Sequence, residues 1–382
     1  MIKSPNILVI AGEASGDIHG AELAHEIKRI RPDVVFWGIG GDGLASAGTE
    51  LIVHARDMAF LGFVEVIRHL PFIRRVFSTI LKEAEKRKPD VAVLIDYPGF
   101  NIRIAKALKK QGIPIVYYIS PQVWAWKERR KHTLAKVVDR MLVIFPFEES
   151  IYRNLGMDVQ FVGNPLVDVV MPSVSREAFF QHFKLSKYHP TLCLLPGSRK
   201  QEVLKLLPPM MESVEILRKS IPELQCVLAV ANTLPDDMIP PLSQKMKCVV
   251  VRGQTYDAMA HCHVAVVASG TATLETALLQ TPMVIVYKLA PLSYAIGRHL
   301  VKVKNIGLVN IVAGKTLVPE LIQHDTHPEK IAATVFPFLA DKELNQRTKQ
   351  ALAQVRTRLG DTGASVRAAR AVVDFIQPSS GK

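Results

Sequence analysis

Short runs rich in valine, isoleucine and leucine alternate with longer amphipathic stretches along this 382-residue chain. Most of the runs are continuously apolar, which is typical of strands that are covered on both faces. Between the first two runs, Leu23, Ile27 and Ile30 recur with the period of a helix. This pattern of βαβ units predicts an α/β fold with doubly wound parallel sheets.

The predicted strands fall into two series, separated by a helix-like stretch at 171–190. The first series covers residues 6–11, 34–38, 91–95, 115–119, 140–144 and 159–162, and the second covers 192–195, 225–230, 248–252, 264–268 and 283–287. We therefore expect two Rossmann-like domains, at 1–170 and 190–350. Beyond residue 319 we expect only helices, and we expect those at 351–382 to pack back on the first domain.

Composition narrows the classes of protein further. With 48% hydrophobic residues the chain can fill the cores of two domains, and no apolar run is long enough to predict a transmembrane helix. The first apolar run, at 7–10, is followed by no cleavage-site pattern, so we interpret it as a buried strand rather than a signal peptide. We expect a cytoplasmic protein whose four cysteines, which form no C-x-x-C pair, stay reduced.

The net charge is +13, from 48 Lys and Arg against 35 Asp and Glu. Nearly all of the excess lies in three segments, 58–88, 127–140 and 287–304, each with a net charge of +4. A basic protein of this kind can bind nucleic acid, an anionic membrane or a phosphorylated substrate. Because no zinc-finger spacing or RNA-binding aromatic motif accompanies the charge, we disfavour nucleic acid.

The segment 58–88 mixes apolar residues with Arg68, Arg74 and Arg75, as interfacial membrane helices do, although Pro71 would break or kink a single helix. An ordinary amphipathic core helix with a solvated basic face is the alternative. The segment 287–304 has the same mixed character and favours the membrane interpretation.

Ligands of open α/β sheets collect where strands end, so the loops after the predicted strands are the candidate sites. The first loop, GEASGDIHG, matches neither the dinucleotide-binding G-x-G-x-x-G nor the hydrolase G-x-S-x-G. Its Ser15 and Gly16 are candidates to bind an anion or a sugar hydroxyl at a helix N-terminus, and a plain tight turn is the alternative.

The loop LLPGSRKQE follows the first strand of the second series. Ser198 and Gln201 match a capping box, which predicts Ser198 as the N-cap and Arg199 as the first helical residue. At this position the guanidinium of Arg199 and the free backbone N–H groups would bind the same anion. A diphosphate is a suitable anion for such a site. Glu202, in the first helical turn, belongs to the same candidate binding site.

The loop ASGTATLETALL repeats the order of strand, small-residue turn and helix. Gly270 and Thr271 would let a ligand approach the backbone closely, and Glu275 would accept hydrogen bonds from ribose hydroxyls. Because the second domain carries two loops suited to phosphate, we expect the nucleotide there and the acceptor on the first domain.

In the first domain, the segment IDYPGFN places Asp96 at a strand end without an adjacent Lys or Arg. Asp96 is therefore a candidate general base, and capping of the turn before Pro98 is the alternative. The segment SPQVWAWKERR puts Trp124 and Trp126 beside a basic run. These residues would bind a sugar or a lipid headgroup. The alternative is that they are ordinary residues of the core and the surface.

His261 and His263 are spaced with one residue between them, and we interpret both as structural because no further ligand cluster accompanies them. The chain has no D-x-D motif. We therefore predict no metal and no cofactor, with Arg199 and helix N-termini neutralising the leaving group.

Six motifs occur in a fixed order over essentially the whole chain: AGEASGD, IDYPGFN, SPQVWAWKERR, LPGSRKQEV, ASGTATLE and VNIVAGK. Together they resemble the lipid-A-disaccharide synthase family, whose members are inverting glycosyltransferases with two Rossmann-like units and the active site in the cleft between them. The resemblance implies that Asp96, Arg199 and Asn310 matter for activity. VNIVAG stands where some members read PNLLAG, and we expect little consequence for Asn310.

The resemblance implies transfer of 2,3-diacylglucosamine from its UDP donor to the C6 hydroxyl of 2,3-diacylglucosamine 1-phosphate, which yields UDP and the β-1,6 disaccharide of lipid A. We expect a protein peripheral on the cytoplasmic face of the inner membrane, bound to its anionic surface. The oligomeric state stays open, with a homodimer among the states considered. The rival functions are a UDP-sugar epimerase and a non-catalytic, membrane-associated nucleotide-sugar binder.

Overall fold

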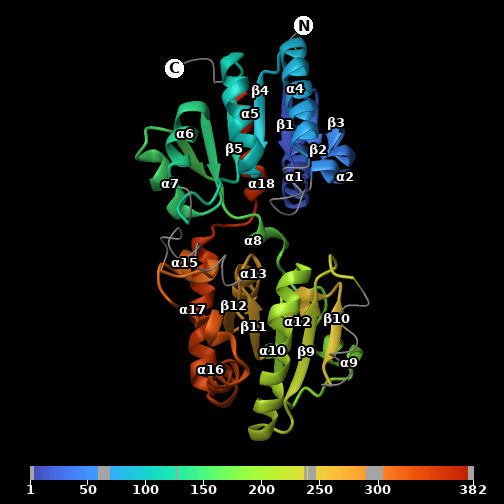
Figure 1. Ribbon diagram of the computed structural model, residues 1–382, viewed down its shortest axis with the longest axis vertical. Coiled ribbons are helices and arrows are strands. Elements are labelled where there is room, and N and C mark those ends of the chain that lie inside the picture. The colour runs from blue at the N-terminus through green and yellow to red at the C-terminus, as the bar shows by residue number, and fades with distance from the viewer. Residues whose placement is uncertain are drawn as a thin grey trace. The chain divides into compact units, whose positions relative to one another are not determined.

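The computed structural model describes residues 4–58, 69–125, 128–235, 239, 247–289 and 304–376. The chain divides into two compact units, of residues 1–168 with 360–382 and of residues 169–359 (Figure 1). Each unit contains a parallel sheet with helices packed against it, so the predicted α/β class with two doubly wound sheets is confirmed.

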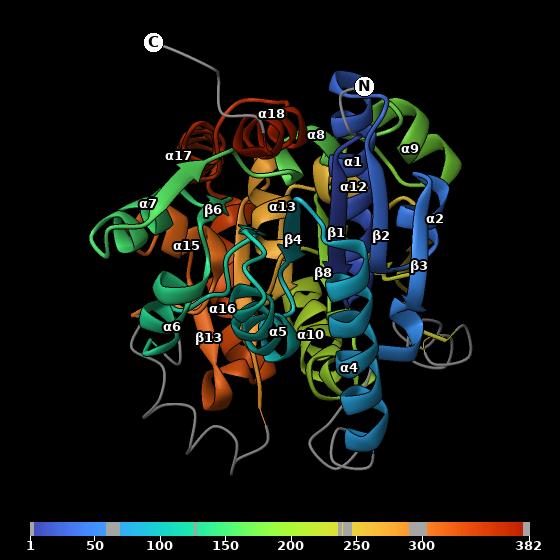
Figure 2. The same cartoon turned by 90° about the horizontal axis from the view of Figure 1, so that it is seen from above.

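In the described residues the first unit has a seven-stranded sheet in the order β3-β2-β1-β4-β5-β6-β7, and Figure 2 shows its first four strands side by side. The strands are β1 Asn6–Ala11, β2 Val35–Gly40, β3 Thr49–His54, β4 Val91–Ile95, β5 Ile115–Tyr118, β6 Arg140–Val143 and β7 Asp158–Phe161. The helices are α1 Ala14–Ile30, α2 Asp42–Ser46, η1 Ala55–Met58, α4 Leu70–Arg87, α5 Pro98–Lys110, α6 Arg130–Val137, α7 Pro146–Arg153, α8 Leu166–Val169 and α18 Ala364–Ile376.

Alternate side chains of β1 enter two different cores. Leu8 and Ile10 pack with α4, α5, α6 and α7, whereas Ile7 and Val9 pack with α1, α2 and α18. This burial on both faces explains why the strands are continuously apolar.

The second unit has, among the described residues, a six-stranded parallel sheet in the order β10-β9-β8-β11-β12-β13. The strands are β8 Thr191–Leu195, β9 Gln225–Val230, β10 Val249–Arg252, β11 Val264–Ala268, β12 Met283–Tyr287 and β13 Glu320–Ile322. The helices are α9 Arg176–His182, α10 Lys200–Ser220, α12 Thr255–His261, α13 Ala272–Leu278, α15 Leu308–Ala313, η3 Gln323–Thr326, α16 Pro328–Ala340 and α17 Lys342–Arg358.

Two edge strands differ from the sequence prediction. The prediction missed β3, and β13 lies in the region where only helices were expected. β13 is three residues long and is defined by its pairing with β12, in which Ile285 stands opposite Glu320. So short a strand has no periodicity of its own, which is why the expectation of helices alone beyond residue 319 was wrong.

The C-terminal segment returns to the first unit at a later residue than predicted. Residues 351–358 belong to α17, which lies in the second unit because Arg358 Nη1 donates to the carbonyls of Val312 and Ala313 at the end of α15. The segment from 360 onward joins the first unit, where α18 packs against α1 (Figures 1 and 2). Asp168 fixes the start of α18 by accepting from the backbone of Gly363 and Ala364 at 2.6 and 3.1 Å.

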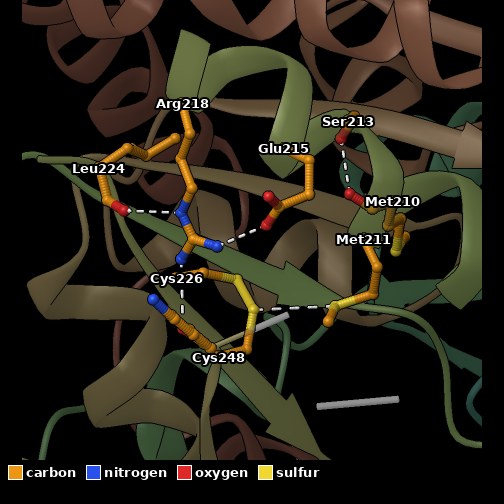
Figure 3. Close-up of a disulfide and its surroundings, with 9 residues drawn as sticks. Met210, Met211, Ser213, Glu215, Arg218, Leu224, Cys226 and Cys248 are labelled. Atoms are coloured by element: carbon orange, nitrogen blue, oxygen red, sulfur yellow. Dashed lines mark hydrogen bonds and ion pairs between the residues drawn. A yellow bond between two sulfur atoms is a disulfide. The ribbon is translucent and has the colours of Figure 1, made fainter. Parts of the chain in front are cut away.

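Cys226 and Cys248 form a disulfide, so the expectation of four reduced thiols was wrong (Figure 3). The pair lies where β9 and β10 run side by side, and the two Cα atoms are 4.8 Å apart. Strand pairing brings together two cysteines that are 22 residues apart in the sequence. Cys193 and Cys262 are free and buried, as expected.

The basic segments are only partly described. On α4, Arg74 and Arg75 are exposed, whereas Phe72, Ile73 and Phe77 pack against the core. The apolar face of this helix is thus used in the core, and its basic face is exposed. α4 begins at Leu70, and Pro71 lies in its first turn, where it does not interrupt the helix. Arg68, Trp126 and residues 290–303 lie outside the described residues.

None of the described helices is long and apolar enough to cross a membrane.

Candidate functional site

A cavity of about 580 Å³ opens in the second unit where several parallel strands end. Its walls are the segments that follow β8, β9, β10 and β11. The strand order reverses between β8 and β11, because β9 and β10 lie on one side of β8 and β12 lies beyond β11. Doubly wound sheets bind ligands in the crevice at this switch point.

The loop after β8 brings Gly197, Ser198, Arg199 and Glu202 to the cavity wall. Gly197 has a φ of +113°, and a β-carbon there would lie 2.6 Å from Glu202 Oε2. Arg199 Nη1 forms an ion pair with Glu202 Oε1 at 3.1 Å, while 72% of the Arg199 side chain stays exposed. The cation predicted in this loop therefore faces the cavity, and among the described residues one carboxylate pairs with it.

The predicted cap of α10 is wrong. Arg199 is the N-cap residue, with extended backbone angles, and α10 begins at Lys200. Ser198 is exposed, and its carbonyl accepts from Thr233 Oγ1 at 2.9 Å, which holds it in the loop before the helix. The capping box of Ser198 and Gln201 is not formed, because the helix starts one residue later than that motif requires.

The loop after β11 forms the opposite part of the cavity wall. Gly270 has a φ of +156°, and a β-carbon there would meet no atom within 4 Å. Thr271 is the N-cap of the short helix α13, and Glu275 follows in its first turn. Burial raises the pKa of Glu275, and the Tyr256 hydroxyl donates to its Oε1 at 3.3 Å. Open space at Gly270 and a half-buried carboxylate thus face the same cavity.

Two further residues of the cavity wall were not predicted from the sequence. Tyr256 reaches Glu275 from α12, and Asp257 accepts from the Ser173 N–H and hydroxyl, both at 2.7 Å. Asp257 thereby fixes the segment before α9 against α12. No sequence motif marks either residue, because both act on partners that are distant in the chain.

Asn310 lies outside the cavity wall and is fully buried. Its amide donates to the Val318 carbonyl and to Glu320 Oε1 at 2.9 and 2.7 Å. Its carbonyl oxygen accepts from the backbone N–H groups of Leu317 and Val318 at 2.8 and 3.0 Å. All of its hydrogen-bonding capacity is used to hold the chain between α15 and β13.

In the first unit, the GEASGD loop joins β1 to α1. Ser15 is exposed in the first helical turn and Gly16 is buried, with Glu13 as the N-cap. The buried Asp17, which the prediction overlooked, accepts from the backbone N–H groups of Gly41, Gly43 and Leu44 at 2.6, 2.9 and 3.0 Å. This carboxylate therefore caps α2, which gives that part of the motif a structural role.

Asp96 follows β4, and Glu13 lies two residues beyond β1. These strands are neighbours, with Ala11 opposite Ile95, and the strand order of the first sheet reverses between them. Burial and the negative charge of Glu13 raise the pKa of Asp96 to about 6. Among the described residues no side chain forms a hydrogen bond or ion pair with the Asp96 carboxylate. A half-buried carboxylate with this pKa has the properties of a general base.

Trp124 points its polar edge into the protein. Its Nε1 donates to Glu148 Oε1 at 3.0 Å, and its ring packs edge-on against Phe147. Glu148 is fully buried in the first turn of α7, and burial raises the pKa of its carboxyl to about 8. Glu148 was not predicted as a site residue, although a Glu at the third position of a helix is a known capping signal.

Both histidines of the second series have structural contacts, as predicted. His261 Nε2 lies 2.9 Å from the Val174 carbonyl, and His263 Nδ1 accepts from the Thr191 N–H at 3.0 Å.

Two linked units with parallel sheets are also the fold of known nucleotide-sugar enzymes. A UDP-N-acetylglucosamine 2-epimerase from Neisseria meningitidis, solved with UDP-N-acetylglucosamine, superposes with a TM-score of 0.63 at 12% identity, covering 98% of this chain and 100% of that one. A calicheamicin glycosyltransferase superposes with a TM-score of 0.59 at 16% identity, covering 100% of both chains. The chain therefore has the GT-B fold.

The sequence comparisons identify the family within that class. The family model for lipid-A-disaccharide synthetase matches residues 7–375. The lipid-A-disaccharide synthase of Syntrophus aciditrophicus is 47% identical over 381 residues, which cover 99% of this chain and 100% of the relative. The chain belongs to the lipid-A-disaccharide synthase family. It is a glycosyltransferase that forms the lipid A disaccharide from a UDP-sugar donor and a sugar acceptor.

Proposed function

We propose that the donor is UDP-2,3-diacylglucosamine and that the acceptor is 2,3-diacylglucosamine 1-phosphate. The observation that supports this proposal best is the cavity at the switch point of the second sheet. It offers a cation for a diphosphate, open backbone for close approach and a carboxylate for sugar hydroxyls.

In this proposal Arg199 binds the diphosphate of the donor, with Ser198, Gly270 and Thr271 beside it. The Arg199 side chain is exposed, and among the described residues Glu202 is its ion-pair partner, so its guanidinium is accessible to a phosphate. Glu275 accepts from the ribose hydroxyls. Its bond to Tyr256 occupies Oε1, and no described residue forms a hydrogen bond with Oε2.

The first domain, residues 1–168 with 360–382, holds the acceptor in this proposal. The oxygen of the acceptor C6 hydroxyl attacks the anomeric carbon of the donor sugar. The bond from that carbon to the β-phosphate oxygen breaks, UDP leaves with the electron pair, and the hydroxyl proton passes to the Asp96 carboxylate. A single displacement inverts the anomeric carbon and needs no covalent sugar–enzyme intermediate. Ser15 and Gly16 contribute to sugar binding at the start of α1.

The decisive experiment incubates the protein with both diacylated substrates and detects the disaccharide by mass spectrometry and UDP by chromatography. Asp96→Asn should fold, bind UDP and lose most disaccharide formation, whereas near-normal turnover would exclude Asp96 as the base. UDP release without the acceptor would instead indicate an epimerase. Thermal protection by UDP without any product would indicate a nucleotide-sugar binder.

Arg199→Ala should weaken UDP binding by tenfold or more, because a charge-assisted contact is worth about 1.5–3 kcal/mol. Arg347→Ala is the matched control. Arg347 is a similarly exposed arginine of the same unit that pairs with Glu343 on its own helix and lies outside the cavity wall. Equal UDP affinities of the two variants would remove Arg199 from the donor site.

We further propose that the protein binds the anionic cytoplasmic face of the inner membrane, where its lipid substrates lie. The exposed Arg74 and Arg75 on α4 support this proposal. Reversing the charge at both should weaken binding to vesicles with anionic lipid and leave the thermal transition unchanged. Unchanged vesicle binding would remove α4 from the membrane contact. The oligomeric state stays open, and light scattering of the purified protein would test for a homodimer.

A further inference from the structure

The turn that carries Asp96 has an unusual backbone. Asp96 and Tyr97 have φ values of +42° and +45°, so two consecutive residues with β-carbons are in the left-handed region. This conformation is unfavourable for residues other than glycine and persists only where the surrounding structure holds it.

Two buried side chains hold this turn through its carbonyls. The Tyr117 hydroxyl donates to the Asp96 carbonyl at 2.5 Å, and Asn101 Nδ2 donates to the same oxygen at 2.9 Å. Asn101 Nδ2 also donates to the Ile95 carbonyl at 3.1 Å. Tyr117 and Asn101 are both fully buried. The Asp96 carbonyl thus has two side-chain donors from different elements, β5 and α5.

The Tyr117 hydroxyl can donate to the Asp96 carbonyl at every working pH. Burial raises the pKa of its hydroxyl well above the usual value, so the hydroxyl keeps its proton and stays a donor. Its strand is fixed to β4, with Tyr117 opposite Leu94 in the parallel ladder. The donor therefore comes from a rigid part of the sheet.

The Asp96 carboxylate has no such support from side chains, because none of those described forms a hydrogen bond or ion pair with it. Its position depends on the backbone of the turn. A proton acceptor must lie within hydrogen-bond reach of the hydroxyl that it deprotonates, so a small displacement of this turn would slow the transfer.

We propose that Tyr117, together with Asn101, is a positioning residue that acts through the Asp96 carbonyl to hold the carboxylate where it can accept the proton of the acceptor hydroxyl. This inference rests on the proposed role of Asp96 as the base. Neither Tyr117 nor Asn101 takes the proton itself.

The test is Tyr117→Phe, which removes only the hydroxyl and keeps the buried ring. We expect kcat to fall by about tenfold to a hundredfold, as a displacement on the order of 1 Å does, with KM for both substrates unchanged. A freer turn lets water reach the carboxylate, so the acid limb of the rate profile should move below pH 6 toward the ordinary carboxyl range.

Tyr118→Phe is the matched control. Tyr118 is the next residue on β5 and is equally buried, but it packs in the core on the other face of the sheet. Among the described residues its hydroxyl donates no hydrogen bond to the Asp96 turn. This variant should keep the kcat and the pH profile of the wild-type protein.

Several outcomes would overturn the inference. If Tyr117→Phe shows a lower melting temperature with unchanged kcat and pH profile, the hydroxyl is only structural. If Tyr117→Phe does not fold, Asn101→Ala is measured instead, because it removes the other donor to the Asp96 carbonyl. An unchanged pH profile of Asn101→Ala would mean that this contact is only structural. Asp96→Asn is measured in parallel, and normal turnover by that variant would contradict the base assignment itself, whatever the Tyr117 variant does.

Discussion

Gly12 lies directly against the ring of Tyr97. A β-carbon at residue 12 would lie 2.5 Å from Tyr97 Cε1 and 2.9 Å from Tyr97 Cγ, well inside van der Waals contact. The two residues belong to different motifs, GEASGD and IDYPGFN, which follow the neighbouring strands β1 and β4. The contact fixes the first loop against the turn that carries Asp96. The glycine at residue 12 is therefore required for close packing.

Replacing this glycine should disturb both loops. We expect Gly12→Ala to lower the free energy of unfolding by about 1–3 kcal/mol through overpacking, as measured by urea denaturation. Gly16→Ala is the control for stability, since a β-carbon there would be 3.6 Å or more from its neighbours. In a helix that change should be neutral or stabilising by up to about 1 kcal/mol. Equal effects of the two variants would contradict the packing argument.

The rate of disaccharide formation should depend on pH through Asp96. Because the pKa of Asp96 is raised to about 6, kcat/KM should fall about tenfold per pH unit below pH 6, where the base is protonated. Glu13→Gln removes a nearby negative charge and should move this acid limb to lower pH. Burial, the larger cause, persists in that variant, so the limb should stay above pH 4.

Glu26→Gln serves as the control for this shift. Glu26 lies on the same helix but pairs with Arg29 on the surface. Its removal should leave the acid limb in place. An acid limb that is the same in Glu13→Gln and in the wild-type protein would show that Glu13 does not influence the base.

The contacts of Asn310 predict a structural defect when it is truncated. In Asn310→Ala the buried backbone N–H groups of Leu317 and Val318 lose their acceptor, and each buried donor left without a partner costs about 1–3 kcal/mol. We expect a loss of stability of about 3 kcal/mol or more in thermal denaturation. Asn305→Ala, which removes a partner of exposed Thr316, should cost less than about 0.5 kcal/mol. An inactive Asn310→Ala variant with normal stability would point to catalysis instead.

The central strands could be predicted from the sequence because burial on both faces leaves a continuous apolar run. The predicted bounds at 6–11, 91–95 and 264–268 agree with β1, β4 and β11. The edge strand β3 could not be found in this way, since most of its residues are only partly buried. β3 is defined by its pairing with β2, which its local sequence does not contain.

The candidate site, like the fold, could be predicted only in part from the sequence. Arg199 and Gly270 lie in the loops that follow β8 and β11, and Glu275 lies in the first turn of α13. The structure brings all three to one cavity. Tyr256 and Tyr117 could not be found, because each acts on a residue from another element through tertiary packing. The spacing of residues along the chain carries no information about such contacts.

Glu148 should make the protein less stable as pH rises. Its folded-state pKa is about 8, against about 4.3 for an unfolded chain, so between these values the folded state holds a proton that the unfolded state has lost. Stability should therefore fall between about pH 4.3 and 8, by up to about 1.4 kcal/mol per unit. Glu148→Gln keeps an acceptor for Trp124 and should flatten this slope. A slope that persists in Glu148→Gln would contradict the prediction.

The disulfide of Cys226 and Cys248 should stabilise the second unit without affecting the donor site. It closes a loop of 22 residues, which is worth about 3 kcal/mol in the chain-entropy model. The cavity lies at the opposite ends of β9 and β10, so reduction should lower the melting temperature and leave UDP binding unchanged. Arg218 also holds the residues next to both cysteines. It donates to the carbonyl of Leu224 (Figure 3) and to that of Lys247.

Alkylation in denaturant, followed by mass spectrometry, checks the pairing itself. Without a reductant we expect two labelled thiols, Cys193 and Cys262, and after reduction all four. The double variant Cys226→Ala with Cys248→Ala should melt like the reduced protein and no longer respond to reductant. Four labelled thiols before reduction would contradict the pairing. A loss of UDP binding on reduction would mean that the cavity depends on the spacing of β9 and β10 at their far ends.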